Sequence, residues 1–323
     1  MDFGIKGKVA IVTGTNRKGA MGAAIATALA KEGADIACVD IVMPGCEQVA
    51  ASLKEFGVRS IAVKADQSDY DQVKAAVERI KAEFGPPEIL VNNAALLRGG
   101  GRIETTTIED WKNLMKIDLD GPWYWIRECW ASMVEKKFGR IINISSIAGV
   151  QGGFGQANYS SAKGAVISLA KTAALEGARA GITANAVTLG VVDTMGDMPA
   201  MPAGGPPPGG GPPPGGPRPG GPPPGAGPGG PRPGGPPPGA GPGGPRPGMP
   251  PGGGPPPGAA PGGAPRGPQQ GGTFDRIKTQ IAMREFGKPA DVANLCAYLC
   301  SVQAGYITGQ DVHVMGGLDL FTY

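Results

Sequence analysis

The sequence predicts an α/β fold built on a doubly wound parallel sheet of about seven strands. Three observations support this prediction: short apolar runs alternate with longer stretches of helical periodicity, a glycine-rich turn follows the first apolar run, and proline and glycine are concentrated in residues 199–272. Alternating strands and helices form βαβ units, whose right-handed crossovers place helices on both faces of the sheet. We therefore expect one α/β domain, residues 1–198 and 273–323, interrupted by residues 199–272.

Each strand is predicted from a run of apolar and β-branched residues, and each helix from apolar residues that recur every three to four positions. The predicted strands are Val9–Thr13, Ile36–Asp40, Ser60–Lys64, Ile89–Asn92, Arg140–Ile144, Thr183–Val187 and Asp311–Val314. The predicted helices are Met21–Glu32, Cys46–Phe56, Tyr70–Phe84, Trp111–Glu135, Tyr159–Ala180 and Asp291–Cys300.

The composition describes two different parts of the chain. Of the 57 glycines and 35 prolines among 323 residues, 29 glycines and 30 prolines lie in residues 199–272. This segment repeats PRPGGPPPGAGPGG and has almost no large apolar side chain, so it cannot offset its ordering entropy and is predicted to be disordered. It holds four arginines and no acidic residue. The net charge of +3 therefore leaves the rest of the chain near neutral, which removes most of the support for nucleic-acid binding.

Other features argue against several classes of protein. No apolar run approaches the ~18 residues that span a bilayer, and Lys6 and Lys8 lead directly into a strand-like run, so neither a membrane segment nor a signal peptide is expected. The five cysteines are scattered, as in a reducing cytoplasm. The single histidine, His313, makes a histidine metal site or a Ser-His triad implausible. We therefore expect a cytoplasmic protein without a metal.

The first predicted strand leads into a turn that is typical of nucleotide binding. Residues 13–22 read TGTNRKGAMG and precede a predicted helix, an order that brings backbone N–H groups and a helix N-terminus to a pyrophosphate. The residues expected to contact a dinucleotide here are Gly14, Asn16, Gly19, Met21 and Gly22. This arrangement is that of a Rossmann-like fold.

The residue that ends the second predicted strand indicates which dinucleotide is bound. Asp40 is placed to accept hydrogen bonds from the two ribose hydroxyls of NAD and to repel the 2′-phosphate of NADP. Arg17 and Lys18 argue the other way, because cations in the turn suit a 2′-phosphate. We give Asp40 the greater weight, so NAD is the expected cofactor and NADP the alternative.

Three residues predict acid–base chemistry at the carboxyl edge of the sheet. Tyr159 and Lys163 are four apart on a predicted helix and share one face, and Ser146 follows the strand that ends near residue 144. A tyrosine has a pKa of ~10 and needs a stabilised phenolate to act at neutral pH. A lysine ammonium one turn away provides that stabilisation, and Ser146 can hold a substrate oxygen.

These motifs together resemble the short-chain dehydrogenase/reductase family, in its YxxxK alcohol dehydrogenase and ketoreductase branch. The matching segments are the glycine-rich turn, NNAA at 92–95, SS at 145–146, YSSAK at 159–163, NAV at 185–187, GVVDT at 190–194, and the C-terminal stretches 287–293, 308–310 and 316–317. The resemblance covers nearly all of residues 5–198 and 273–320.

The resemblance implies a role for each matching residue. Tyr159 is the general acid/base, Lys163 lowers its pKa and binds the nicotinamide ribose, and Ser146 orients the substrate carbonyl. The remaining residues implied at the cofactor are Asp66 at the adenine, Gln67, Asn92 and Ala94 beside it, and Val192 and Thr194 at the carboxamide. A homotetramer is also implied.

Three of the departures from the family pattern bear on the site and on the lid. Gly14 and Gly22 are eight positions apart instead of six, as in the enoyl reductase branch, although the YxxxK spacing favours alcohol and ketone chemistry. Asp118 stands where the family has its proton-relay asparagine; we expect it to take part in catalysis through Lys163.

The segment 199–272 begins where the substrate-binding lid is expected. It has three interpretations: a tolerated expansion, a binding segment for a protein partner, or a cover over the substrate.

These observations predict an NAD-dependent oxidoreductase that interconverts a secondary alcohol, including hydroxyacyl or cyclic alcohols, and its ketone. The nearest alternative is an NADPH-dependent 3-oxoacyl reductase acting on acyl-carrier-protein or CoA thioesters. An alternative from another class is a scaffold that binds partners through its proline-rich insert.

Overall fold

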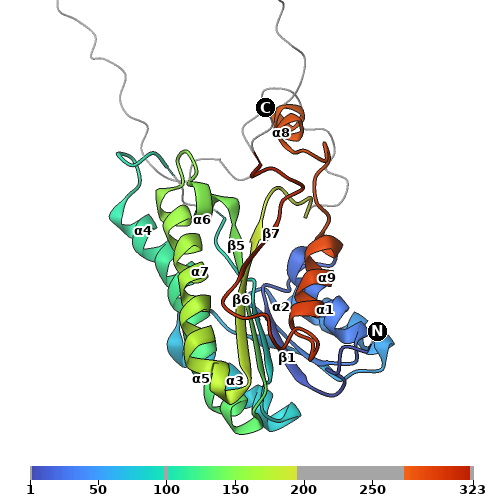
Figure 1. Cartoon of the computed structure of the whole chain (residues 1–323). Coiled ribbons are helices and arrows are strands. Elements are labelled where there is room, and N and C mark those ends of the chain that lie inside the picture. The colour runs from blue at the N-terminus through green and yellow to red at the C-terminus, as the bar shows by residue number, and fades with distance from the viewer. Residues whose placement is uncertain (1, 98–100, 195–272, 321–323) are drawn as a thin grey trace, which may run out of the picture. The chain divides into compact units, whose positions relative to one another are not determined.

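The computed structural model describes residues 2–97, 101–194 and 273–320, all of which belong to one of the two units into which the chain divides, residues 1–203 with 271–323 (Figure 1). The low-complexity segment 199–272 lies outside the described residues, so the interpretations of it stay predictions.

The described chain forms one sheet of seven parallel strands in the order β3-β2-β1-β4-β5-β6-β7. The strands are β1 (Val9–Thr13), β2 (Asp35–Asp40), β3 (Ser60–Lys64), β4 (Ile89–Asn92), β5 (Gly139–Ser146), β6 (Ile182–Leu189) and β7 (Asp311–Val314). This confirms the predicted Rossmann-like, doubly wound sheet. Every residue of β1, β2 and β4 is buried, because helices cover both faces of a parallel sheet.

The helices form two layers on opposite faces of the sheet (Figure 1). The helices are α1 (Met21–Lys31), α2 (Met43–Leu53), α3 (Tyr70–Phe84), α4 (Ile108–Met115), α5 (Gly121–Lys136), α6 (Ile147–Gln151), α7 (Ala157–Gly177), α8 (Thr273–Gln280) and α9 (Pro289–Leu299). One core packs α1, α2 and α9 against the sheet, and the other packs α3, α5 and α7. None of the helices in the described ranges is long and apolar enough to cross a membrane.

The strand order determines where a ligand can bind. The chain adds strands in one direction from β1 to β3 and then returns to place β4 on the other side of β1. Loops at the carboxyl ends of β1 and β4 therefore part from one another, and this switch point is where open α/β sheets bind ligands.

The helix predicted at residues 111–135 is wrong as a single regular helix. The structure has α4, a π-helical turn η2 (Lys116–Asp120) and then α5. Pro122 is the physical reason: proline has no N–H to donate to the carbonyl four residues earlier, and its ring collides with that carbonyl. The backbone widens instead, and Gly121 N donates to Lys116 O five residues back.

Candidate active site

A cavity of about 590 Å³ lies at the carboxyl edge of the sheet, at the switch point between β1 and β4. Most of the residues predicted for the site line it. They are Gly14, Asn16, Met21, Gly22, Asp40, Asp66, Gln67, Ala94, Tyr159, Lys163, Val192 and Thr194. The lining does not include Gly19, which lies in the glycine-rich turn with φ of +81°. It also does not include Asn92, Asp118 or Ser146, whose positions are described below.

The glycine-rich turn brings backbone close to the cavity. A Cβ on Gly22 would lie 2.2 Å from Gly14 O, so only glycine allows this contact between α1 and the turn. Gly14 has φ of +77°, a conformation that glycine adopts without strain. Residue 20, the N-cap of α1, is an alanine that provides no side-chain cap, and the first turn of α1 contains no acidic residue. The N-terminal backbone of α1 is therefore suited to an anion such as a pyrophosphate.

Asp40 lies at the end of β2 with its side chain largely buried. Its Oδ1 accepts hydrogen bonds from Val42 N at 2.9 Å and from Asn16 Nδ2 at 3.2 Å. The carboxylate is thus held in one orientation beside the glycine-rich turn. Arg17, one of the two cations of the same turn, donates from Nη2 to Thr194 O at 2.8 Å, so part of its guanidinium is bonded to the segment after β6.

The loop that follows β3 contributes two adjacent polar residues. Asp66 Oδ1 accepts from Ser68 N at 2.9 Å and from Ser68 Oγ at 2.8 Å, which fixes the carboxylate at the cavity wall. Gln67 is 6% exposed, and its Nε2 donates to Ala94 O at 3.1 Å and to Ile117 O at 2.7 Å.

Asn92 lies behind the cavity wall, and the neighbouring Asn93 lines the cavity. As the last residue of β4, Asn92 pairs in register with Asn143 of β5, and its Nδ2 donates to Asn143 Oδ1 at 2.9 Å. Asn93 comes after the strand, and its Nδ2 donates to Thr13 O at 2.8 Å and to Gly14 O at 3.3 Å. Asn93 therefore lines the cavity and Asn92 does not, and the expectation that Asn92 helps to build the nucleotide site stays a prediction. Successive side chains of a strand point to opposite faces, so the sequence could have indicated that Asn92 and Asn93 face different sides.

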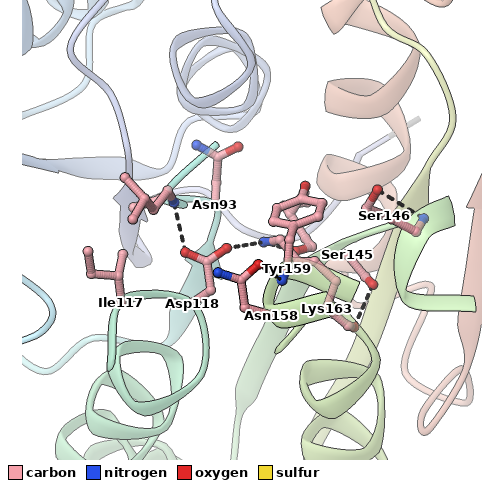
Figure 2. Close-up of polar contacts among 12 residues, drawn as sticks. Asn93, Ile117, Asp118, Ser145, Ser146, Asn158, Tyr159 and Lys163 are labelled. Atoms are coloured by element: carbon pink, nitrogen blue, oxygen red, sulfur yellow. Dashed lines mark hydrogen bonds and ion pairs between the residues drawn. The ribbon is translucent and has the colours of Figure 1, made fainter. Parts of the chain in front are cut away.

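Tyr159 and Lys163 lie one turn apart on α7 and both line the cavity (Figure 2). The Lys163 Nζ is 5.7 Å from the centroid of the Tyr159 ring and donates to Ile144 O at 3.1 Å. Lys163 is buried, with 4% of its surface exposed. The lysine ammonium and the tyrosine ring are therefore neighbours at the cavity wall.

The two serines at the end of β5 point in different directions, since neighbouring strand residues alternate. Ser145 lines the cavity, and its Oγ donates to Lys163 O at 2.8 Å. Ser146 is the N-cap of α6, and its Oγ accepts from Ala148 N at 3.2 Å (Figure 2). This bond uses an oxygen lone pair of Ser146, so the hydroxyl proton remains available to be donated.

Asp118 lies in η2 with none of its surface exposed. Its Oδ1 accepts from Leu96 N at 2.7 Å, and its Oδ2 lies 3.6 Å from Lys163 Nζ (Figure 2). Burial raises the pKa of the Asp118 carboxyl, and the Lys163 ammonium opposes that rise. The structure therefore brings Asp118 to the ammonium end of Lys163, as the sequence predicted, and not to the cavity itself.

Taken together, the described residues fit a dinucleotide. The turn has no room for a Cβ at Gly22, the Asp40 and Asp66 carboxylates are held at the cavity wall, and the Tyr159–Lys163 pair lines the same cavity. No group of three His, Cys, Asp or Glu side chains within the described ranges is arranged to hold a metal ion.

Comparison with known proteins agrees with this architecture. Residues 8–202 match the family model described as short chain dehydrogenase, and residues 257–319 match one described as Enoyl-(Acyl carrier protein) reductase. The chain is 30% identical to the 3-oxoacyl-(acyl-carrier-protein) reductase FabG of Staphylococcus aureus, over 96% of this chain and 98% of that protein. It is 39% identical to the acetoacetyl-CoA reductase of Paracoccus denitrificans, over 58% of this chain and 74% of that protein. An uncharacterized oxidoreductase of Bacillus subtilis, YxjF, is also 39% identical, over 58% of this chain and 72% of that protein. The chain therefore belongs to the short-chain dehydrogenase/reductase family and is an NAD(P)-dependent oxidoreductase that acts on CH–OH groups.

Proposed function

We propose that this protein uses NAD(H) to interconvert a secondary alcohol and its ketone, with Tyr159 as the general acid/base. One observation supports this assignment above all: the buried Lys163 ammonium lies 5.7 Å from the Tyr159 ring, and both residues line the cavity that Asp40 also lines. An unassisted phenol, with a pKa of ~10, holds its proton too tightly for this chemistry at neutral pH. The adjacent cation removes that obstacle.

The dinucleotide, when bound, supplies or accepts the hydride. In the oxidative direction the Tyr159 phenolate takes the hydroxyl proton of the substrate, and in the reductive direction the phenol returns it to the carbonyl oxygen. The Ser146 hydroxyl, which accepts from Ala148 N, donates its proton to the same substrate oxygen and holds that oxygen beside Tyr159. Asp118 lies 3.6 Å from the Lys163 Nζ and holds the ammonium in place. Because Asp118 belongs to η2, this ion pair joins Lys163 to that turn.

All of the residues proposed to hold the dinucleotide except Gly19 line the cavity. Backbone of Gly14, Asn16, Gly19, Met21 and Gly22 is assigned to the pyrophosphate, Asp66, Gln67 and Ala94 to the adenine side, and Val192 and Thr194 to the carboxamide. Asp40 is assigned to the adenosine ribose. Both of its hydrogen bonds end on Oδ1, so Oδ2 can accept the ribose hydroxyls.

Asp40 favours NAD over NADP, because its buried carboxylate would repel a 2′-phosphate. The bond from Arg17 to Thr194 O supports the same preference, since it draws this cation toward the segment that follows β6.

The second candidate is reduction of a 3-oxoacyl thioester with NADPH. It is favoured by the names of two relatives, 3-oxoacyl-(acyl-carrier-protein) reductase and acetoacetyl-CoA reductase. Initial rates measured with NAD, NADP and their reduced forms, on secondary alcohols, acetoacetyl-CoA and a 3-hydroxyacyl thioester, distinguish the two candidates. Turnover only with NADPH and the thioester would replace the first assignment with the second.

Tyr159→Phe tests the mechanism. The substitution removes the hydroxyl and keeps the ring, so kcat is expected to fall roughly 10²- to 10⁴-fold, while NAD binding measured by calorimetry stays intact. Tyr306→Phe, at a fully exposed tyrosine, is the matched control and should retain activity. Full activity in Tyr159→Phe would disprove the proposed role.

A further inference from the structure

Gln67 connects two parts of the site that are far apart in the sequence. It follows β3, lines the cofactor cavity and is 6% exposed. Its Nε2 donates to Ala94 O at 3.1 Å, in the loop after β4, and to Ile117 O at 2.7 Å, within η2. One amide group therefore joins the cavity wall to the π-helical turn.

The orientation of this amide is determined by its partners. Both partners are carbonyl oxygens, which accept hydrogen bonds and cannot donate them, so the NH₂ group of Gln67 must face them. The Oε1 atom is buried, and no hydrogen-bond partner for it lies among the described residues. A glutamate or an apolar residue at this position would leave both carbonyls without a donor.

The Ile117 carbonyl needs an outside donor because of the local sequence. In a regular helix it would accept from Gly121 N, but that N–H donates to Lys116 O. In a continued π-helix it would accept from residue 122, which is proline and has no N–H. The Gln67 amide supplies the missing bond.

Close packing also joins Gln67 to η2. A Cβ built on Gly121 would lie 2.7 Å from Gln67 Cγ, so the two residues occupy adjoining space without a gap. Ile117 directly precedes Asp118, whose carboxylate binds Leu96 N and lies 3.6 Å from Lys163 Nζ. The chain of contacts therefore runs from Gln67 through η2 to the catalytic lysine.

We propose that Gln67 is a positioning residue, which holds the Ile117 carbonyl and thereby fixes the Asp118 carboxylate against Lys163. Gln67 acts through Asp118 in this proposal, which rests on the proposed function of Tyr159 and Lys163. If Tyr159→Phe retains full activity, the proposed function fails; if only the Gln67 experiments fail, that function stands.

The test is a double-mutant cycle between positions 67 and 118. Gln67→Met keeps the length of the side chain and removes both donors, and it is expected to lower kcat by about 10- to 100-fold, as misplacement of a catalytic group does. The pH–rate profile of Gln67→Met should become the same as the profile of Asp118→Ala. Adding Gln67→Met to Asp118→Ala should lower kcat no further. Effects of the two substitutions that multiply independently would disprove the proposal.

Three further measurements separate positioning from a general loss of stability. Val77→Ala, at a buried residue of α3 away from the site, should lower the melting temperature and leave the pH–rate profile unchanged. Hydrogen exchange of the free enzyme should quicken at residues 116–121 in Gln67→Met and not in Val77→Ala. Gly121→Ala, which pushes its Cβ against Gln67, should reproduce the change in profile. An unchanged profile and unchanged exchange in folded Gln67→Met or Gly121→Ala enzyme would overturn the proposal.

Discussion

At position 118 a carboxylate is buried completely, 3.6 Å from the Lys163 Nζ. Its pKa is raised by burial despite the nearby ammonium. A raised pKa in the folded state means that the protonated form is favoured by folding. The contribution of this group to the free energy of unfolding is present below the pKa of the unfolded state, about 3.8. It is lost as the pH rises through the higher pKa of the folded state.

Asp118→Asn is therefore expected to raise the melting temperature at pH 8, with a gain that disappears toward pH 4. The asparagine keeps an oxygen for Leu96 N and has no charge to bury. The pH–rate profile should also change, because Lys163 loses its ionic neighbour. Thermal unfolding across this pH range and steady-state kinetics measure the two effects. An unchanged profile would remove Asp118 from the relay.

Asp40 is the residue expected to decide cofactor preference. Asp40→Ser removes the carboxylate at the end of β2 and with it charge-assisted hydrogen bonds to the ribose. The KM for NAD is expected to rise about tenfold, which corresponds to roughly 1.4 kcal/mol, and kcat/KM for NADP should rise. Asp35→Ser, at the opposite end of β2, controls for the loss of a strand carboxylate. If the ratio of the two kcat/KM values does not change, the proposed role of Asp40 is wrong.

Among individual residues, sequence reasoning worked where one helix face or one strand end determined the position. Tyr159 and Lys163 line the cavity because residues four apart on a helix share a face. The surroundings of Asn92 could not be predicted in this way, because they depend on its pairing with Asn143 of β5, which the spacing of residues does not show.

At the scale of elements, β7 is joined to the C-terminal loop by the single histidine. His313 Nδ1 is 2.7 Å from Asp319 Oδ2, and its Nε2 is 3.2 Å from Asp311 Oδ2. The same loop accepts a hydrogen bond at Gly316 O from Met283 N at 3.0 Å. Hydrogen bonds to Asp319 and Asp311 raise the pKa of His313, and the bond to His313 lowers the pKa of Asp319.

The protonated histidine therefore stabilises the folded state. Its contribution is complete below the unfolded pKa of about 6.5 and is lost as the pH rises through the higher folded value. His313→Gln should be less stable than the wild type at pH 6 and nearly equal to it once the pH is above the raised pKa of the folded state. Chemical denaturation of both proteins at pH 6 and at the higher pH measures the difference in the free energy of unfolding. A stability gap that is constant with pH would contradict this assignment.

The helix between residues 108 and 136 illustrates what local periodicity misses. The apolar pattern predicts one continuous helix, but Pro122 forces the π-helical turn η2, and Gln67 satisfies the carbonyl that the turn exposes. The periodicity of side chains reports which face is buried and does not report how the backbone accommodates a proline. Here that accommodation places Asp118 beside Lys163.

For the whole molecule, we propose that residues 199–272 are an insertion separate from the catalytic fold. The seven-stranded sheet is complete within the described residues, and its last strand, β7, lies C-terminal to the segment. Replacing 199–272 with a short linker is expected to leave unfolding cooperative and to raise the free energy of unfolding by up to about 2 kcal/mol, through the lower closure entropy of a shorter loop. Calorimetry measures this change, and loss of cooperative unfolding would contradict the proposed division.

The same deletion distinguishes the interpretations of the segment. Unchanged kinetics would reject a cover over the substrate, and an unchanged set of associated proteins would reject a partner-binding role. The homotetramer implied by the resemblance and the cytoplasmic location expected from the scattered cysteines stay predictions. Light scattering on the purified protein measures the first.

The sequence by itself determined the number of strands and their positions along the chain, the glycine-rich turn, and the residues Asp40, Tyr159 and Lys163 at the carboxyl edge of the sheet. These follow from local periodicity and from the fact that parallel strands end at one edge. Only the tertiary structure decided that Asn93 faces the cavity in place of Asn92, that Ser146 caps α6, and that Gln67 joins η2. The positions of Asn93 and Gln67 depend on contacts between segments distant along the chain, whereas the Ser146 cap joins residues two positions apart. The physical reason is that a buried polar group takes whichever partner the fold brings near, and local sequence does not specify that partner.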